Sequence, residues 1–149
     1  MCYSVTTVGV LALQGDFAEH LAMLRKLQMD AREVRLPSEL EGVDGIIIPG
    51  GESTTIARLM DIHGLREPVR ERAQRGMATW GTCAGLILLA KSLEGDRPEP
   101  LGLMDIEVAR NAFGRQVDSF EVDLSMAALG EKPFHAVFIR APVIRELRD

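Results

Sequence analysis

One cysteine of the chain lies between two glycines, at a point where a predicted strand turns into a predicted helix. Cys83 is the centre of Gly81-Thr82-Cys83-Ala84-Gly85, after the apolar run Met77 to Trp80 and before the helical run Leu86 to Lys91. This spacing is typical of a nucleophile elbow, a sharp turn that holds the nucleophile in a strained conformation. The residues two positions away must be small, because the backbones of strand and helix approach closely there. A buried, inert cysteine is the alternative interpretation.

A second candidate segment, Pro49-Gly50-Gly51-Glu52-Ser53, follows an apolar run that is predicted to be a parallel strand. The carboxyl ends of such strands form the edge at which open α/β sheets bind ligands. Two adjacent glycines let backbone amides face a substrate, as an oxyanion hole requires. The segment lacks the Gly-Lys-Ser/Thr ending of a phosphate-binding loop. An ordinary turn is the alternative interpretation.

Arginines mark two further segments of the second half. Arg110 and Arg115 belong to Arg110-Asn111-Ala112-Phe113-Gly114-Arg115-Gln116, which could hold a carboxylate because a guanidinium binds one through two hydrogen bonds. A solvated loop is the alternative there. Arg140 ends the apolar run that begins at Phe134, and is either a ligand or a charged strand terminus.

Composition excludes several classes of protein. The 149 residues suffice for one domain with a real core. The net charge of −5, from 17 basic and 22 acidic residues, and the absence of a basic stripe argue against a nucleic-acid partner. No apolar run is long enough to span a membrane, and the start of the chain does not resemble a secretory signal. We therefore expect a cytoplasmic protein.

The cysteine and histidine positions argue against stabilisation by cross-links or metals. Only Cys2 and Cys83 occur, so a disulfide framework is excluded and a reducing compartment is expected. The three histidines are scattered, without the spacing of metal ligands, and no metal site is predicted. They are His20, His63 and His135.

Strands and helices alternate through the first half, which predicts a doubly wound, mostly parallel α/β sheet flanked by helices. The strands are predicted at residues 8–13, 31–36, 45–49 and 77–80, and the helices after an N-cap at Asp16, at 54–60 and at 66–75. After Ser92 the chain becomes rich in strands, which are predicted at 103–108, 117–124 and 134–140. We expect one domain over residues 1–149.

Taken together, these segments resemble class I, triad-type glutamine amidotransferases, and most closely the glutaminase subunits of pyridoxal 5′-phosphate synthase. The resemblance extends over nearly the whole chain, in order and at compatible spacing. It is carried by Leu13-Gln14-Gly15-Asp16-Phe17-Ala18-Glu19-His20, Pro49-Gly50-Gly51-Glu52-Ser53-Thr54-Thr55, Gly81-Thr82-Cys83-Ala84-Gly85-Leu86, the segment from Arg110 to Phe120, and Phe138-Ile139-Arg140-Ala141-Pro142.

The resemblance implies a flavodoxin-like fold and a site for L-glutamine, without a cofactor. Cys83 would attack the side-chain amide of glutamine and form a thioester, with release of ammonia. The backbone amides of Gly51 and Ala84 would hold the oxyanion. The glutamine pocket would be lined by Gly50, Gly51, Glu52, Arg110, Ile139 and Arg140.

The resemblance also implies a partner in a hetero-oligomer. The ammonia would pass to a synthase subunit that makes pyridoxal 5′-phosphate (vitamin B6) and that activates the glutaminase. Gln14 and His20 would lie near the interface with that subunit, and Gln14 would help to order the oxyanion loop.

The sequence departs from the family at its end. The family's triad includes a His and a Glu, in a His-Pro-Glu string near the C-terminus. The present sequence stops at Asp149, before that string would begin, and none of its three histidines replaces the triad histidine by position. We therefore expect a C-terminally incomplete amidotransferase domain, which lacks part of the family fold.

Two alternatives to an active glutaminase remain open. In the first, the chain is a truncated, non-catalytic subunit that docks on the synthase and binds glutamine without turnover. In the second, it is another α/β enzyme with a cysteine elbow, such as a thiol hydrolase, which the segment from Arg110 to Phe120 disfavours.

Overall fold

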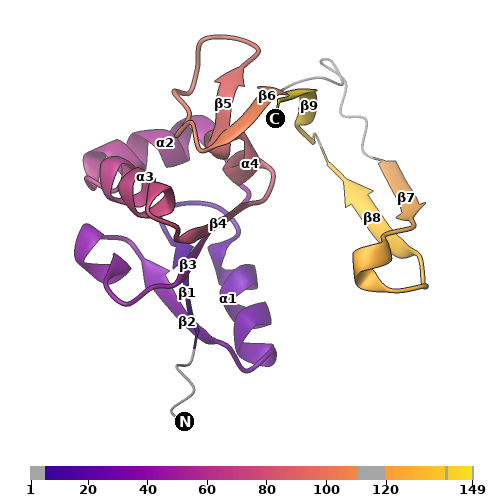
Figure 1. Cartoon of the computed structure of the whole chain (residues 1–149), viewed down its shortest axis with the longest axis horizontal. Coiled ribbons are helices and arrows are strands. Elements are labelled where there is room, and N and C mark those ends of the chain that lie inside the picture. The colour runs from indigo at the N-terminus through magenta and orange to yellow at the C-terminus, as the bar shows by residue number, and fades with distance from the viewer. Residues whose placement is uncertain (1–5, 111–119, 140, 149) are drawn as a thin grey trace.

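The computed structural model describes residues 6–110, 120–139 and 141–148. Its main sheet has four parallel strands in the order β2-β1-β3-β4 (Figure 1). The strands are β1 (Thr7–Leu11), β2 (Asp30–Val34), β3 (Gly45–Ile48) and β4 (Ala78–Gly81). The order and the parallel pairing confirm the predicted sheet.

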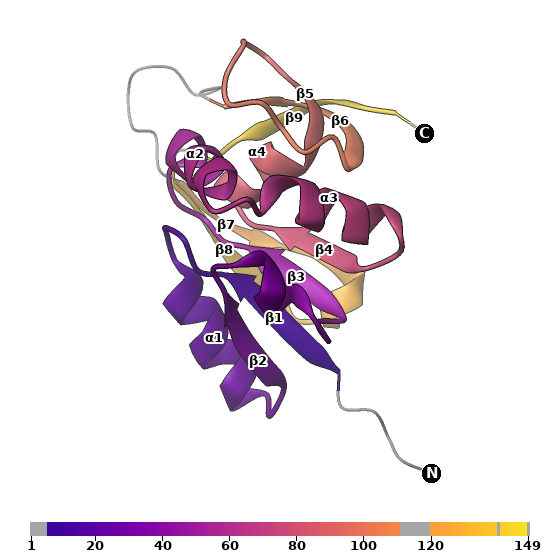
Figure 2. The ribbon, with the colours of Figure 1, turned by 90° about the vertical axis from the view of Figure 1, so that its left-hand side faces the viewer.

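Helices cover both faces of this sheet, because alternate side chains of each buried strand point to opposite sides (Figure 2). Val10 and Ile47 pack against α1 (Phe17–Lys26). Leu11, Ile46 and Ile48 belong to a larger cluster on the other face. That cluster includes side chains of α2 (Ser53–Ile62), α3 (Arg66–Gln74) and α4 (Ala84–Leu89). Strands buried on both faces explain the continuous apolar runs of the sequence, and the doubly wound arrangement is confirmed.

The second half is rich in strands, as predicted, with two differences. A second sheet has the order β5-β6-β9 and a third is the antiparallel hairpin β7–β8. The bounds are β5 (Ala90–Leu93), β6 (Met104–Ala109), β7 (Phe120–Leu124), β8 (Phe134–Phe138) and β9 (Val143–Leu147), with short 3-10 turns at Pro37–Leu40 and Ala127–Leu129. The helix predicted to reach Lys91 ends at Leu89 instead, because the next residues pair with β6. Strand β9 was not predicted.

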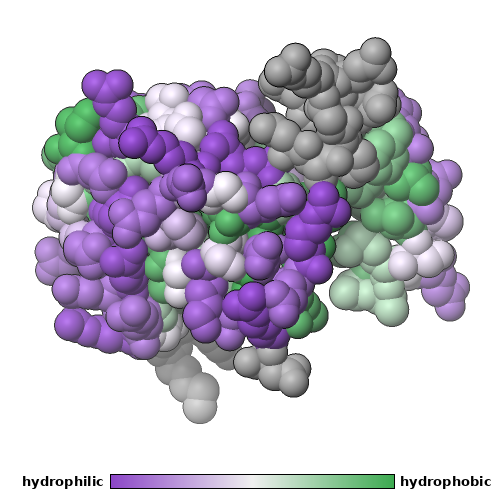
Figure 3. All heavy atoms as spheres, turned by 90° about the horizontal axis from the view of Figure 1, so that it is seen from above, coloured by the Kyte–Doolittle hydropathy of each residue, from purple (hydrophilic) through white to green (hydrophobic). Residues whose placement is uncertain are grey.

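The hairpin β7–β8 stands apart from the main sheet, on the same side as α1 (Figures 1 and 2). Hydrophobic residues gather on its surface (Figure 3, right). The exposed hydrophobic residues of the two strands and the turn between them are Phe120, Val122, Met126, Leu129, Phe134 and Val137. Residues 117–119, which were predicted to open β7, lie outside the described residues.

The α1 side of the main sheet is open near β4. A hollow of about 320 Å³ there is lined mainly by apolar atoms, including Val8, Leu24, Ile47 and Trp80. Trp80 is 59% exposed.

Three arginines, rather than a wide apolar stripe, attach α3 to its neighbours. Val69 is the buried residue of this helix. Arg66 donates to the backbone oxygen of Glu99 (2.9 Å), and Arg70 to that of Leu101 (3.0 Å). Arg72 donates to the oxygen of Val43 (2.8 Å) and also to that of Leu40. The helix is therefore held by charge-assisted hydrogen bonds to carbonyls on two sides.

Among the residues that the structure describes, no helix is long and apolar enough to cross a membrane. Within the same residues, no group of three or more histidine, cysteine, aspartate and glutamate side chains is placed to hold a metal ion.

We predict that Arg72→Met lowers the free energy of unfolding by about 1–3 kcal/mol, because two partly buried carbonyls lose their donors. The control is Arg75→Met at the C-cap of the same helix, where the lost ion pair with Glu71 is exposed and spans 3.6 Å. That variant should stay within about 0.5 kcal/mol of the unmodified chain. Urea unfolding measures both values, and equal losses would contradict the assignment.

Candidate active site

Three loops meet at the carboxyl edge of the main sheet. Residues 14–16 follow β1, residues 50–52 follow β3, and residues 82–83 follow β4. Strand β1 is flanked by β2 on one side and β3 on the other, so the strand order changes direction there. Such switch points are where open α/β sheets bind ligands. The two main segments singled out in the sequence are therefore neighbours in space.

The elbow around Cys83 has the predicted strained geometry. Cys83 has φ 49° and ψ −102°, a conformation that a residue with a side chain rarely adopts. A Cβ on Gly81 would lie 2.4 Å from the carbonyl carbon of Gly85, and one on Gly85 would lie 2.0 Å from the oxygen of Ile48. Both glycines are therefore required by close backbone contact. Cys83 is exposed, so the interpretation as a buried cysteine is wrong.

The glycine loop after β3 is held by the turn after β1. The side-chain oxygen of Gln14 accepts a hydrogen bond from the backbone N–H of Glu52 at 2.8 Å. The backbone N–H of Asp16 donates to the oxygen of Gly50 at 3.0 Å. Asp16 occupies the N-cap position of α1, but its side chain makes no capping hydrogen bond, which corrects that part of the prediction. The predicted contact between Gln14 and this loop is present.

A small pocket of about 140 Å³ joins the elbow to charged residues. Glu52 and Arg110 both line it and form an ion pair, with Oε1 and Nη2 3.6 Å apart. Glu52 also accepts from the hydroxyl of Thr54 at 3.0 Å, and Arg110 donates to the backbone oxygen of Arg97. The pocket is lined by Gly51, Glu52, Ser53, Cys83, Ile87, Arg110 and Ile139.

Most of the site residues predicted from the sequence therefore lie together. Gly50 is buried next to the elbow, where an added Cβ would lie 3.6 Å from that of Cys83, and Ala84 is buried directly after Cys83. Arg140 lies outside the described residues. Ser53 and Ile87 line the pocket but were not predicted. Ile87 lies one helical turn after Cys83, and this spacing was the signal that could have identified it.

The three histidines lie in different places. His20 is on α1, and its Nε2 is 3.1 Å from the hydroxyl oxygen of Thr82, inside the elbow. His63 is the C-cap of α2. His135 is on the hairpin β7–β8, where it pairs with Asp123 (2.8 Å) and Glu121 (3.1 Å). The contact of His20 with the elbow was not predicted, because the sequence placed His20 only near a partner surface.

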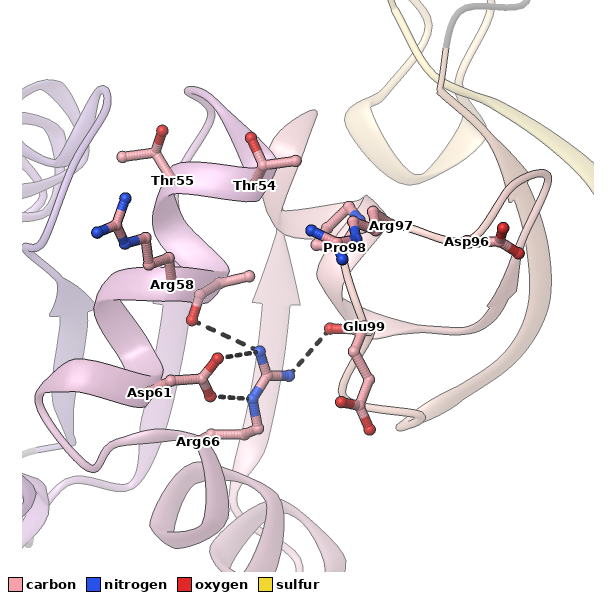
Figure 4. Close-up of a pocket in the computed structure, with 10 residues that line it drawn as sticks. Thr54, Thr55, Arg58, Asp61, Arg66, Asp96, Arg97, Pro98 and Glu99 are labelled. Atoms are coloured by element: carbon pink, nitrogen blue, oxygen red, sulfur yellow. Dashed lines mark hydrogen bonds and ion pairs between the residues drawn. The ribbon is translucent and has the colours of Figure 1, made fainter.

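A larger hollow of about 620 Å³ lies beside α2, and its lining does not include Cys83 (Figure 4). Arg66 forms one of its walls, bound to Asp61 and to the backbone oxygen of Glu99 (2.9 Å). The hydrogen bond to Asp61 raises the pKa of the Arg66 guanidinium above its usual value. Three arginines and three acidic residues line this hollow, so their charges balance: Arg58, Arg66, Arg97, Asp61, Asp96 and Glu99.

Residues 10–149 match the model of the SNO glutamine amidotransferase family. Two similar relatives are both named pyridoxal 5′-phosphate synthase subunit PdxT. The protein from Moorella thermoacetica is 57% identical over 140 residues, which are 94% of this chain and 74% of the relative. The protein from Herpetosiphon aurantiacus is 60% identical over 146 residues, which are 96% of this chain and 77% of the relative.

Solved structures agree with this result. A crystal structure of a glutamine amidotransferase superposes with a TM-score of 0.87 at 51% identity, covering 98% of this chain and 76% of the other. A putative peptidase E from Listeria monocytogenes superposes with a TM-score of 0.58 at 14% identity, over 68% of this chain and 65% of the other. At that identity the likeness concerns the fold alone.

We predict that Gly15→Ala destabilises the chain more than Gly95→Ala does. Both glycines have a positive φ (97° and 109°), so each alanine costs about 1–2 kcal/mol of backbone strain. Only at Gly15 would the new Cβ also clash, 1.9 Å from the oxygen of Gly50, whereas Gly95 faces open space. The clash should add about 1–3 kcal/mol. Urea unfolding of the two variants measures the difference, and equal losses would show that the two loops are not tightly packed.

Proposed function

The chain belongs to the SNO glutamine amidotransferase family, and we propose that it is the glutaminase subunit of a pyridoxal 5′-phosphate synthase. It hydrolyses L-glutamine to glutamate and ammonia, and the ammonia passes to a synthase subunit in a hetero-oligomer. Two observations support this proposal. The exposed Cys83 lies at a strained elbow and shares a pocket with a Glu–Arg ion pair. The relatives at 57% and 60% identity are named as subunits of that synthase.

In the proposed reaction, the thiolate of Cys83 attacks the side-chain amide carbon of glutamine. The tetrahedral oxyanion receives hydrogen bonds from the backbone amides of Gly51, in the glycine loop, and Ala84, directly after Cys83. The C–N bond then breaks, and the nitrogen takes up a proton and leaves as ammonia. A glutamyl thioester remains on Cys83 until water hydrolyses it to glutamate and the free thiol.

The two charged side chains of the pocket are complementary to the α-carboxylate and α-ammonium groups of a free amino acid. Arg110 would bind the α-carboxylate of glutamine through its guanidinium, and Glu52 would bind the α-ammonium group. In the structure the two side chains lie close enough to neutralise each other, at 3.6 Å. Glutamine would replace this pair by two ion pairs of its own. Ile139 borders the same pocket, and from the family resemblance we place Arg140 and Gly50 beside it.

Turnover at Cys83 requires an acid–base partner that activates the thiol. Without such a partner the rate usually falls by several orders of magnitude. Neither His63, at the end of α2, nor His135, on the hairpin, lines the pocket of Cys83. A chain that docks on the synthase and binds glutamine without turnover is therefore the second candidate. Gln14 and His20, next to the two loops of the site, are where we place the synthase interface.

We predict that Cys83→Ala lowers glutamate release from glutamine, measured with a synthase subunit present, by at least about 1,000-fold. The control is Cys2→Ser, which changes the other cysteine of the chain and should leave the rate unchanged. If the unmodified chain binds the synthase but releases no glutamate, the non-catalytic candidate is correct. If release persists in Cys83→Ala, the proposed nucleophile is wrong.

We predict that Arg110→Met weakens glutamine binding by about 10- to 100-fold, because the carboxylate loses a charge-assisted hydrogen bond. Arg97→Met is the matched control, since it keeps the backbone carbonyl that binds Arg110 and changes a side chain of the other hollow. Calorimetric titration with glutamine measures both affinities and does not require turnover. Unchanged binding in Arg110→Met would place the carboxylate elsewhere.

A further inference from the structure

The start of α1 contacts both halves of the proposed catalytic centre. Gln14 and Asp16 hold the glycine loop after β3 through two hydrogen bonds. One turn further along, His20 reaches the elbow after β4. The first of these contacts supports the proposed oxyanion site. The second had no role in the mechanism above, and it joins residues that are 62 positions apart in the sequence.

The imidazole of His20 lies between two residues of the β4 end. Its Nε2 is 3.1 Å from Thr82 Oγ1, and its ring meets the ring of Trp80 edge-on, with centroids 5.9 Å apart and planes at 75°. Edge-to-face contacts at this distance are favourable. Both His20 and Thr82 are half-buried, which shields their hydrogen bond from competing water. The ring is thus fixed by two contacts of different kinds.

Thr82 directly precedes Cys83, whose positive φ must be enforced by its surroundings. The backbone of Thr82 is held on both sides, because its N–H donates to Ile48 at 3.1 Å and its oxygen accepts from Gly85 at 2.8 Å. These bonds hold the peptide groups but leave the threonine side chain unrestrained. The contact with His20 restrains the side chain and ties the elbow to α1.

We propose that His20 is a positioning residue, which holds Thr82 and thereby fixes the elbow of Cys83 relative to the glycine loop. The consequence for catalysis rests on the proposed function, in which Cys83 is the nucleophile. The contact itself makes a separate prediction for the reactivity of the Cys83 thiol. This prediction can be tested without any glutamine turnover.

The test uses the full chain carrying Cys2→Ser, so that alkylation by iodoacetamide reports on Cys83. His20→Phe keeps a ring against Trp80 but removes the polar nitrogen, and Thr82→Val removes the hydroxyl at constant shape. Each should slow alkylation by about three- to tenfold, the usual weight of one hydrogen bond. The double variant should be no slower than either single one, because both remove the same contact.

Conservative variants distinguish loss of the hydrogen bond from a general disturbance of the local structure. His20→Gln places an amide where Nε2 lies, and Thr82→Ser keeps the hydroxyl, so both should alkylate near the unmodified rate. The glutamine concentration that half-protects Cys83 should not change in any variant, because the contact involves neither Glu52 nor Arg110, which are proposed to hold the charged groups of glutamine. Unchanged rates in His20→Phe and Thr82→Val, additive losses in the double variant, or no rescue would each overturn the proposal. If the chain has no glutaminase activity, the proposed function is wrong, but the alkylation rates of Cys83 still test whether His20 positions the elbow.

Discussion

Close contact between backbones at the carboxyl edge of the sheet is the constraint on which the rest of the structure depends. The turn after β1 meets the loop after β3, where an added Cβ on Gly51 would lie 2.9 Å from the Cα of Gly15. The elbow meets the end of β3, where Gly85 approaches the oxygen of Ile48. These contacts leave no room for a Cβ at the glycines, so peptide groups lie next to Cys83 at this edge, beside the charged side chains of Glu52 and Arg110. The chemistry of the site thus follows from how tightly the chain packs.

A second set of contacts extends from the outer helix α3 to the pocket. Its arginines hold the loop after β5 at the backbone oxygens of Glu99 and Leu101. The backbone oxygen of Arg97, in the same loop, accepts from Arg110, which pairs with Glu52 in the pocket. Through this series of guanidinium–carbonyl hydrogen bonds, helix α3 helps to fix the position of the Arg110 guanidinium, although no residue of α3 lines the pocket. Because each bond is directional, the helix fixes an orientation as well as a distance.

The sequence predicted those parts of the fold that are determined locally. The apolar run ending at Ile48 and the glycines around Cys83 identified a strand and an elbow, since burial and close approach restrict the residue types there. The first two residues of β5, Ala90 and Lys91, were assigned to a helix, because the strand character of β5 comes from pairing with β6. The contact between His20 and Thr82 was also missed. It depends on how α1 packs beside β4, which no local pattern of residues encodes.

The hairpin β7–β8 has a consequence for ligand exchange. Two-stranded ribbons are marginally stable by themselves, and this one is held across its strands by the stacked rings of Phe120 and Phe138, 4.7 Å apart. Ile139, directly after β8, borders the pocket. One wall of the pocket therefore follows a two-stranded ribbon, while the elbow and the glycine loop follow strands of the four-stranded sheet. Opening of such an element precedes global unfolding, so entry and exit of a ligand on this side need not disturb the elbow.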